Sequence, residues 1–233
     1  MHDVDLPPRP GSTFFKFCPH YKFGRADRAL YYAALCGFHD LAEHLILNYP
    51  KQVNAYGGHY VTPLVAALAR EHFKVAELLL RHGAATTVNV RGNRRQIPLH
   101  SAAYYGQLDA VQLLLKHGAD VKSQDDFGGT ALHYLCAGSE NRRGLDVPQK
   151  FANIARLMLE HDADVNARNG NRETPLHIAA RSGEVEVARV LLENGAKINE
   201  EDDKGRTPFQ HALERKQNEI IKLLSDHGTN SSR

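Results

Sequence analysis

The sequence has no tryptophan, two methionines and three cysteines among its 233 residues. The cysteines, Cys18, Cys36 and Cys136, are odd in number, widely spaced and without a CxxC pair. A disulfide scaffold is therefore not expected, and the pattern favours a reducing compartment. No apolar run approaches the roughly 18 to 20 residues of a membrane-spanning helix, and the acidic amino terminus is unlike the basic start of a signal peptide. The sequence thus predicts a soluble, cytoplasmic protein with no membrane partner.

The sequence also lacks an excess of charge of either sign. Lysine and arginine number 29 and aspartate and glutamate 27, which gives a net charge of +2. A protein dedicated to nucleic acid normally carries a strongly basic segment, and no segment of this chain is strongly basic. Nucleic acid is therefore not expected as the partner, and phosphate or nucleic-acid binding through clustered arginines is kept as an alternative function.

What the sequence does have is an internal repeat. Six similar segments begin near residues 28, 62, 97, 130, 174 and 207, at intervals of 34, 35, 33, 44 and 33 residues. One interval is thus longer than the others, and the rest keep one period. The segments are Arg28-Ala-Leu-Tyr31, Thr62-Pro-Leu-Val65, Ile97-Pro-Leu-His100, Thr130-Ala-Leu-His133, Thr174-Pro-Leu-His177 and Thr207-Pro-Phe-Gln210.

Each repeat predicts two short helices. A residue suited to capping precedes a proline, which is tolerated at the first helical position because its missing N–H would be unpaired there. A second helix follows, as in the apolar stripe of Leu108, Val111, Leu114 and Leu115, and it ends at a glycine suited to a left-handed cap. A second motif keeps the same phase, in His82-Gly83-Ala84, His117-Gly118-Ala119, His161-Asp162-Ala163, Asn194-Gly195-Ala196 and His227-Gly228.

The T-P-L-H start and the G-A ending resemble the ankyrin-repeat family over about residues 25 to 228. The resemblance implies an all-α ankyrin-repeat solenoid of about six helix-turn-helix repeats with short hairpin-like loops. Two departures stand out: Glu71 replaces the glycine that ends a first helix, and Arg95 replaces a loop glycine. The segments 29–38 and 57–64 further resemble the ankyrin arrays at the C-terminal ends of fungal multidomain signalling proteins with a NACHT-type NTPase module.

The sequence contains no pattern that predicts a catalytic or metal-binding site. The sequence has no G-x-S-x-G, Walker A or H-E-x-x-H motif. His100, His133 and His177 recur once per repeat, so stacking separates them by about 10 Å, too far to share a metal ion. In the family this histidine bonds its own loop and the next one. The predictions are therefore no enzyme, no cofactor and no metal.

The repeats divide the chain into three parts. Residues 1–24 are predicted to be an aromatic N-terminal capping segment, 25–228 the ankyrin-repeat domain and 229–233 a flexible tail. The N-terminal segment either covers the first repeat or docks on an upstream domain. The long interval predicts an insertion, 138–149, that projects as a polar loop between the helices of repeat four and either binds a partner or reflects neutral drift.

The resemblance implies a non-catalytic scaffold in signalling, monomeric by default, that binds another protein through loop tips and first helices of a concave face. Tyrosine and arginine at these positions favour binding, since they are common at interface hot spots. A mixture of exposed polar residues could also arise without function. The predicted partner-binding residues are His59, Tyr60, Arg70, Arg94, Gln96, Tyr104, Tyr105, Phe127, Arg181 and Arg206.

Overall fold

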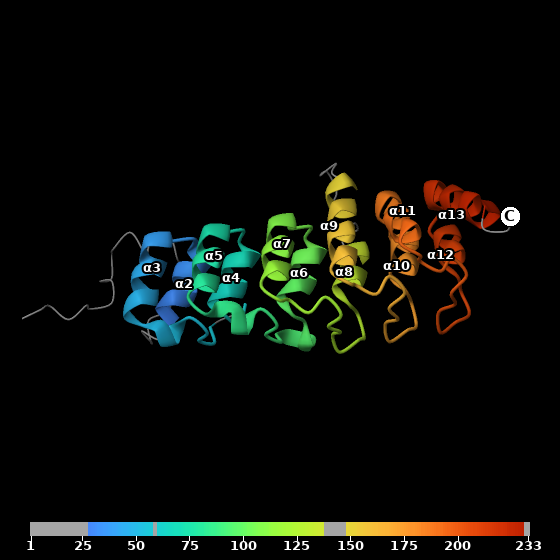
Figure 1. The fold of residues 1–233 in the computed structure, drawn as a ribbon. Helices are drawn as coiled ribbons and strands as arrows, with labels where there is room; N and C mark the ends of the chain where they lie inside the picture. Colours follow the sequence, from blue (N-terminus) through green and yellow to red (C-terminus); the bar gives the residue numbers. More distant parts are fainter. Residues whose placement is uncertain (1–27, 58–59, 138–147, 231–233) are drawn as a thin grey trace, which may run out of the picture. The chain divides into compact units, whose positions relative to one another are not determined.

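The structure is a computed structural model that describes residues 28–57, 60–137 and 148–230. The chain forms two compact units, unit 1 (Met1–Val88) and unit 2 (Asn89–Arg233). Within the described ranges it contains twelve α-helices and no strand (Figure 1). The prediction of an all-α fold is therefore confirmed. The predicted capping segment, 1–24, lies outside the described residues.

Unit 1 contains two helix pairs. The first helices of the pairs, α2 and α4, pack together, and the second helices, α3 and α5, do the same. Each pair is also packed internally, so the unit has two helical layers. The elements are α2 (Ala29–Cys36), α3 (His39–Asn48), η2 (Pro50–Gln52), α4 (Pro63–Ala69), α5 (Phe73–Arg81) and η3 (Ala84–Thr87).

Unit 2 repeats this arrangement over four pairs. The first helices pack in the order α6, α8, α10 and α12, and the second helices in the order α7, α9, α11 and α13. The loops that link the pairs extend away from the helices at one side of the unit (Figure 1). The elements are η4 (Asn93–Arg95), α6 (Pro98–Tyr104), α7 (Leu108–Lys116), α8 (Ala131–Ala137), α9 (Pro148–Glu160), α10 (Pro175–Ser182), α11 (Val185–Glu193), α12 (Pro208–Glu214) and α13 (Asn218–Asn230).

The ends of the first helices follow from the repeat sequence. Thr62 is the N-cap of α4, where its hydroxyl accepts a hydrogen bond from the Val65 amide at 3.4 Å, and proline follows at the first helical position. Left-handed residues follow several first helices, for example Gly106 with φ 63° after α6. Glu71 takes the same conformation with φ 60°, so this departure from the glycine pattern leaves the local geometry unchanged.

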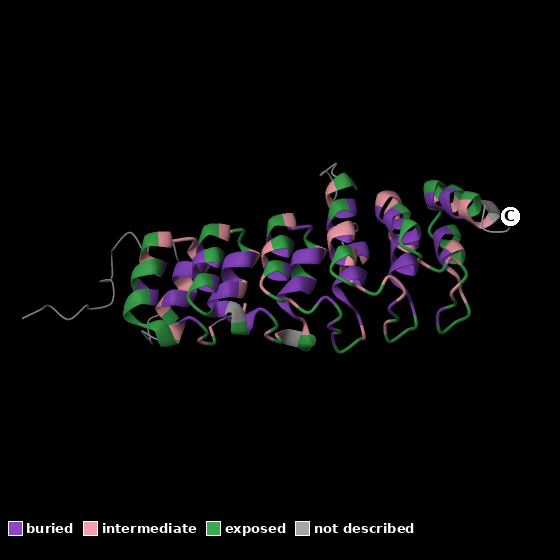
Figure 2. Ribbon diagram, viewed as in Figure 1, coloured by how far each residue is buried: buried purple, intermediate pink, exposed green. Residues whose placement is uncertain are grey.

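The core of each unit combines alanine with leucine. Alanine pairs of the first helices, such as Ala66-Ala67 in α4 and Ala179-Ala180 in α10, are fully buried, and their small side chains let neighbouring helices approach closely. The leucine of each T-P-L-H motif, as in Leu99 and Leu176, is also fully buried. Figure 2 shows the buried residues on the sides where the helices of each unit meet, and exposed residues on the outward faces of the second helices and along parts of the loops.

Three details differ from the sequence expectations. Helix α9 begins at Pro148, so the last two residues of the predicted insertion, 138–149, are helical, while 138–147 lie outside the described residues. Helix α13 continues through Gly228 to Asn230, so the first two residues of the predicted tail, 229–233, are helical too. Cys36 is disulfide-bonded, contrary to the expectation of reduced cysteines, and Cys136 is a buried free thiol.

None of the helices in the described parts of the chain combines the length and apolarity needed to cross a membrane.

Candidate functional site

The predicted site residues of unit 2 lie on four loops and the first helices beside them. Each loop is closed by a backbone hydrogen bond from the amide of its first residue to the carbonyl of its fifth, at 2.8 to 3.0 Å. Neighbouring loops are joined by further backbone bonds, such as Asp126 N to Arg94 O at 3.1 Å and Asp203 N to Asn171 O at 2.9 Å. The loops are therefore held together by main-chain contacts. We name them loop three (92–96), loop four (125–129), loop five (169–173) and loop six (202–206).

Buried histidines fix each loop to a helix. His100 accepts a hydrogen bond at Nδ1 from the Ile97 amide at 3.2 Å, and its Nε2 lies 3.1 Å from the Gly129 carbonyl. The ring therefore carries its proton on Nε2, which it donates to loop four. His133 and His177 repeat this geometry toward the Glu173 and Arg206 carbonyls. Burial lowers the pKa of all three rings, as the neutral bridging role requires.

The end of α6 and loop four carry the most exposed aromatic side chains of the described part of unit 2. Tyr105 is 68% exposed and Phe127 is 59% exposed. The guanidinium of Arg94 lies 5.5 Å from the centre of the Phe127 ring, a cation–π contact. Tyr104 meets Tyr105 edge to face with ring centres 5.2 Å apart. We call the five residues Arg94, Gln96, Tyr104, Tyr105 and Phe127 the aromatic–basic surface.

A hydrogen-bonded network supports this surface from below. The hydroxyl of Tyr134 accepts a bond from Gln96 at 2.5 Å and donates one to Asp125 Oδ2 at 2.6 Å. Asp125 Oδ1 in turn accepts the amides of Phe127 and Gly129 at 2.9 and 2.7 Å. Burial, together with the bond to Asp125, raises the pKa of Tyr134 to about 12, so the phenol stays protonated. The network therefore fixes loop four and the side of loop three that carries Gln96.

Tyr134 was missed by the sequence reasoning. It follows the repeat histidine, a position with serine in one repeat and isoleucine in another, and nothing local marks it as functional. Its partner Gln96 lies 38 residues earlier in the chain, so only the packing of neighbouring repeats reveals the pair.

Loop three has an unusual backbone. Arg94 and Arg95 have φ values of 55° and 56°, whereas loops four, five and six each have a single left-handed residue. This conformation is unfavourable for a side chain other than glycine by about 1 to 2 kcal/mol per residue. Such strain is frequent where a side chain must be presented for function. Arg95 lies 3.8 Å from Asp126 across the loops, in an exposed ion pair.

Arg181, in α10 beside loop five, and Arg206, in loop six, bond carboxylates of the same chain. Arg181 pairs with Glu173, whose side chain is 6% exposed. Arg206 donates to Asp202 at 2.8 Å and to Glu214 at 3.2 Å. Burial alone would raise the pKa of Glu173 and Asp202, but hydrogen bonds from neighbouring side chains and amides outweigh it and lower the pKa of both carboxyls. Both predicted binding arginines, Arg181 and Arg206, are thus engaged by carboxylates of their own chain.

A possible ligand set for a metal lies within this ion-pair network. Glu173, Asp202 and His211 have ligand atoms within 4.8 Å of one another, and all three residues are buried. His211 Nε2 contacts Asp202 at 2.9 Å. The guanidinium groups of Arg181 and Arg206 already bond the two carboxylates and would repel a cation. The arrangement therefore fits an internal ion-pair network and not a metal site.

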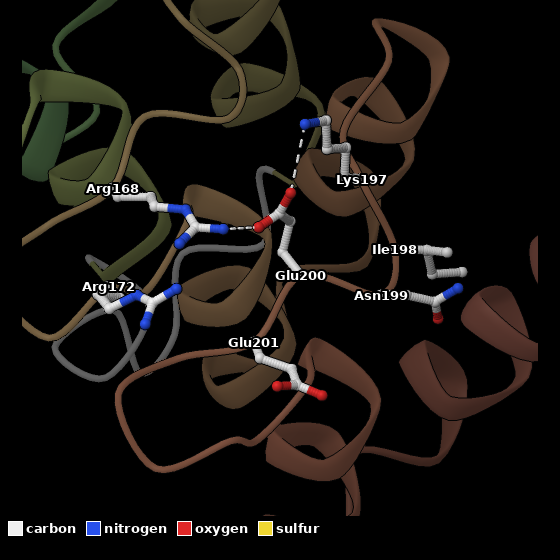
Figure 3. Close-up of a pocket in the computed structure, with 7 residues that line it drawn as sticks. All are labelled: Arg168, Arg172, Lys197, Ile198, Asn199, Glu200 and Glu201. Atoms are coloured by element: carbon white, nitrogen blue, oxygen red, sulfur yellow. Dashed lines mark hydrogen bonds and ion pairs between the residues drawn. The ribbon is translucent and has the colours of Figure 1, made fainter.

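Figure 3 shows an open pocket beside loops five and six. Three of its seven lining residues are basic, and the Glu200 carboxylate lies between Arg168, with which it forms an ion pair, and Lys197, whose Nζ is 3.3 Å away (Figure 3). The glutamate thus neutralises charge that a phosphate group would need. Sequence reasoning did not predict this pocket, which is lined by Arg168, Arg172, Lys197, Ile198, Asn199, Glu200 and Glu201.

The predicted residues of repeat two belong to unit 1. The amide of Tyr60 donates to the Tyr31 hydroxyl at 3.2 Å, and Arg70 is exposed at the end of α4. His59 lies outside the described residues. The structure therefore brings together the predicted residues of loop three, loop four and the end of α6, and the surface is described for unit 2 alone.

Comparison with known proteins agrees with this architecture. A family model described as ankyrin repeats in three copies matches residues 30–125, 99–202 and 145–233. The chain belongs to the ankyrin-repeat family. Ankyrin repeats are generally protein–protein interaction modules. The bridging histidines and hairpin-like loops thus give this ankyrin-repeat chain a rigid frame on which exposed side chains can vary.

Several curated relatives share the repeats. The chain is 37% identical over 122 residues to "Ankyrin repeat and SOCS box protein 16" of Homo sapiens, which covers 52% of this chain and 24% of that protein. The Mus musculus protein of the same name is 35% identical over 179 residues, covering 63% of this chain and 38% of the relative. "Transient receptor potential cation channel subfamily A member 1" of Homo sapiens is 28% identical over 166 residues, 70% of this chain and 14% of the channel. The ankyrin-repeat chain thus spans well under half of each relative.

Proposed function

We propose that this ankyrin-repeat chain is a non-catalytic recognition scaffold whose partner protein docks on the aromatic–basic surface of unit 2. The observation that carries the proposal is the exposure of Tyr105 and Phe127 on a supported frame. Exposed aromatic side chains that are already held in place lose little conformational entropy on binding, and they contribute large contact areas. The left-handed backbone at Arg94 adds a second indication, because it holds the guanidinium against Phe127 at the expense of stability.

Phosphate or nucleic-acid binding is supported less well. That function needs several cationic side chains free to meet phosphates. Arg168, Arg181 and Arg206 are each paired with a carboxylate, and the chain is nearly neutral. A protein partner therefore agrees better with the distribution of charge.

We further propose that the chain acts in the cytoplasm as a monomeric arm of a longer signalling protein. The relatives support the longer context, because the chain spans only 24% and 38% of the two SOCS box proteins. Sedimentation velocity over a range of concentrations tests the monomer, and a dimer would contradict it.

The binding proposal is tested by affinity capture from a lysate followed by quantitative mass spectrometry. A Tyr105→Ala, Phe127→Ala double variant is compared with the wild-type chain and with Tyr56→Ala, which removes an equally exposed tyrosine of unit 1. We expect a partner that wild type and Tyr56→Ala retain and the double variant loses. Equal retention by all three folded proteins would move the binding site away from the aromatic–basic surface.

A further inference from the structure

Arg94 differs from the other arginines predicted to bind a partner in unit 2. Arg181 and Arg206 meet carboxylates of their own chain. Among the described residues, Arg94 has no carboxylate partner, and its guanidinium lies over the exposed Phe127 ring, 5.5 Å from the ring centre. A cation–π contact uses none of the guanidinium N–H donors, so they remain available to bond a carboxylate in bidentate fashion. The structure therefore leaves one oriented positive charge for a ligand.

The surroundings of Arg94 are basic as well. Arg91, Arg94 and Arg95 are all exposed, and the carboxylate that faces them from loop four is Asp126, 3.8 Å from Arg95. The other carboxylate of loop four, Asp125, is buried and already bonded to Tyr134 and to two amides. Three positive charges against one exposed negative charge favour an acidic ligand.

The aromatic side chains set a second requirement on the ligand. From Phe127 a chain of contacts runs through Asp125 and Tyr134 to Tyr104 and Tyr105, with Tyr134 and Tyr104 ring centres 6.5 Å apart. The exposed rings at the two ends, Phe127 and Tyr105, offer apolar area on both sides of this chain. A ligand that covers both must carry apolar side chains along its length.

We propose that the ligand of the aromatic–basic surface is an acidic segment of the partner protein, with one carboxylate paired to Arg94 and apolar side chains on Phe127 and Tyr105. This inference rests on the proposed function and specifies the chemistry of the partner. Single-stranded nucleic acid is also anionic and stacks on aromatic rings, but it depends on several phosphate contacts along a basic groove. Loop four has no lysine or arginine, and the exposed arginines on the Arg94 side all lie within residues 91–95, so the acidic protein segment is the better match.

The test begins with the full chain immobilised and a phage-displayed library of random peptides. We expect enriched peptides to contain aspartate or glutamate next to aromatic or aliphatic residues. Synthetic copies are then titrated against variants by fluorescence anisotropy. Arg94→Glu should weaken the binding of an acidic peptide at least about tenfold, because it replaces a charge-assisted pair with repulsion. Tyr105→Ala should weaken the same peptide as well.

Arg172→Glu is the matched control. Arg172 is exposed, lies in loop five and has φ 60°, so its charge reversal changes the same net charge at a similar left-handed position. We expect a clearly smaller loss of affinity for this variant than for Arg94→Glu, since Arg172 is not one of the residues of the aromatic–basic surface and an exposed charge that does not pair with the ligand is screened by salt. Circular dichroism checks the folding of each variant, and Arg94→Gln replaces Arg94→Glu if the latter is unfolded.

The outcomes separate this inference from the proposed function. Enriched peptides that are neutral or basic but lost with Tyr105→Ala would overturn the acidic ligand and leave the docking surface in place. A peptide that binds Arg94→Glu as well as wild type, or a library without any enriched peptide, would also overturn the inference, while the affinity capture judges the surface independently. Oligothymidylate that binds through Arg94 more tightly than every enriched peptide would assign the surface to nucleic acid.

Discussion

The four loops of unit 2 share one backbone frame, but their arginines have different partners. Loops three and four differ in this respect from loops five and six. Beside loop five and in loop six, Arg181 of α10 and Arg206 pair with the buried carboxylates of Glu173 and Asp202. In loops three and four the buried network is built around a phenol, and Arg94 faces an exposed ring. Sequence position alone therefore does not separate a binding arginine from a structural one, because the difference depends on whether an internal carboxylate is within reach.

The largest expected effect is on the buried carboxylate of loop six. Asp202 accepts hydrogen bonds from the Lys204 and Arg206 amides at 2.9 and 2.8 Å, and it also contacts the side chains of Arg206 and His211. Asp202→Ala leaves these buried groups without their partner and should lower the free energy of unfolding by about 3 to 5 kcal/mol. Urea denaturation followed by circular dichroism measures the loss.

Asp126→Ala is the matched change in loop four. It removes an exposed carboxylate 3.8 Å from Arg95 and should alter the free energy of unfolding by no more than about 0.5 kcal/mol. Similar losses for the two variants would remove the contrast between the loop pairs.

Acid should weaken loops five and six in a defined direction. The pKa of Glu173 and of Asp202 is lowered in the folded chain, so the unfolded chain takes up protons first as the pH falls. Their stabilisation is fully present above the ordinary values of 4.5 and 3.8 and is lost as the pH falls through the lowered native values. The loss amounts to at most about 1.4 kcal/mol per pH unit for each carboxyl.

Amide hydrogen exchange of α10 and α12, corrected for intrinsic rates, tests this dependence. Asp202→Asn should reduce the slope of the opening free energy against pH below pH 4, since the amide side chain cannot titrate. An unchanged slope in that variant would show that other groups control the acid response.

The fold was predictable from the sequence because each repeat carries its own local signals. The Thr-Pro start, the buried leucine and the bridging histidine act within a few residues or toward the next repeat, so the periodic pattern fixes them together. The start of α9 and the end of α13 were not predicted, because the residues just before Phe151 and just after Gly228 are compatible with either a helix or a loop. The ion pairs that Arg181 and Arg206 form with Glu173 and Asp202 were missed, because the sequence does not show whether a carboxylate in a loop is buried or exposed.

A smaller effect is expected for the network under the aromatic–basic surface. Tyr134→Phe keeps the ring contacts with His100 and Tyr104 and removes the hydroxyl between Gln96 and Asp125. We expect a loss of about 1 kcal/mol in the free energy of unfolding, from thermal denaturation. Peptide binding should weaken too, because Gln96 and loop four lose a common anchor. Tyr32→Phe in unit 1 is the control for general effects of a tyrosine-to-phenylalanine change on binding. If Tyr134→Phe has wild-type stability and binding, the network does not support the surface.

The smallest effect separates the backbone of loop three from its side chains. Arg95→Gly relieves a left-handed conformation at φ 56°, while the flexible unfolded state of glycine offsets part of the gain. The net stabilisation should be about 0.5 kcal/mol, measurable by thermal denaturation. Gly128→Ala in loop four should do the opposite, because its φ is 72° and an added Cβ would lie 2.9 Å from the Gly170 amide nitrogen. If the strained backbone serves to present Arg94, then Arg95→Gly will keep the affinity for an acidic peptide while Arg94→Glu loses it. Destabilisation by Arg95→Gly would instead assign the shape of loop three to the Arg95–Asp126 pair, and loop three would then depend on ion pairing as loops five and six do.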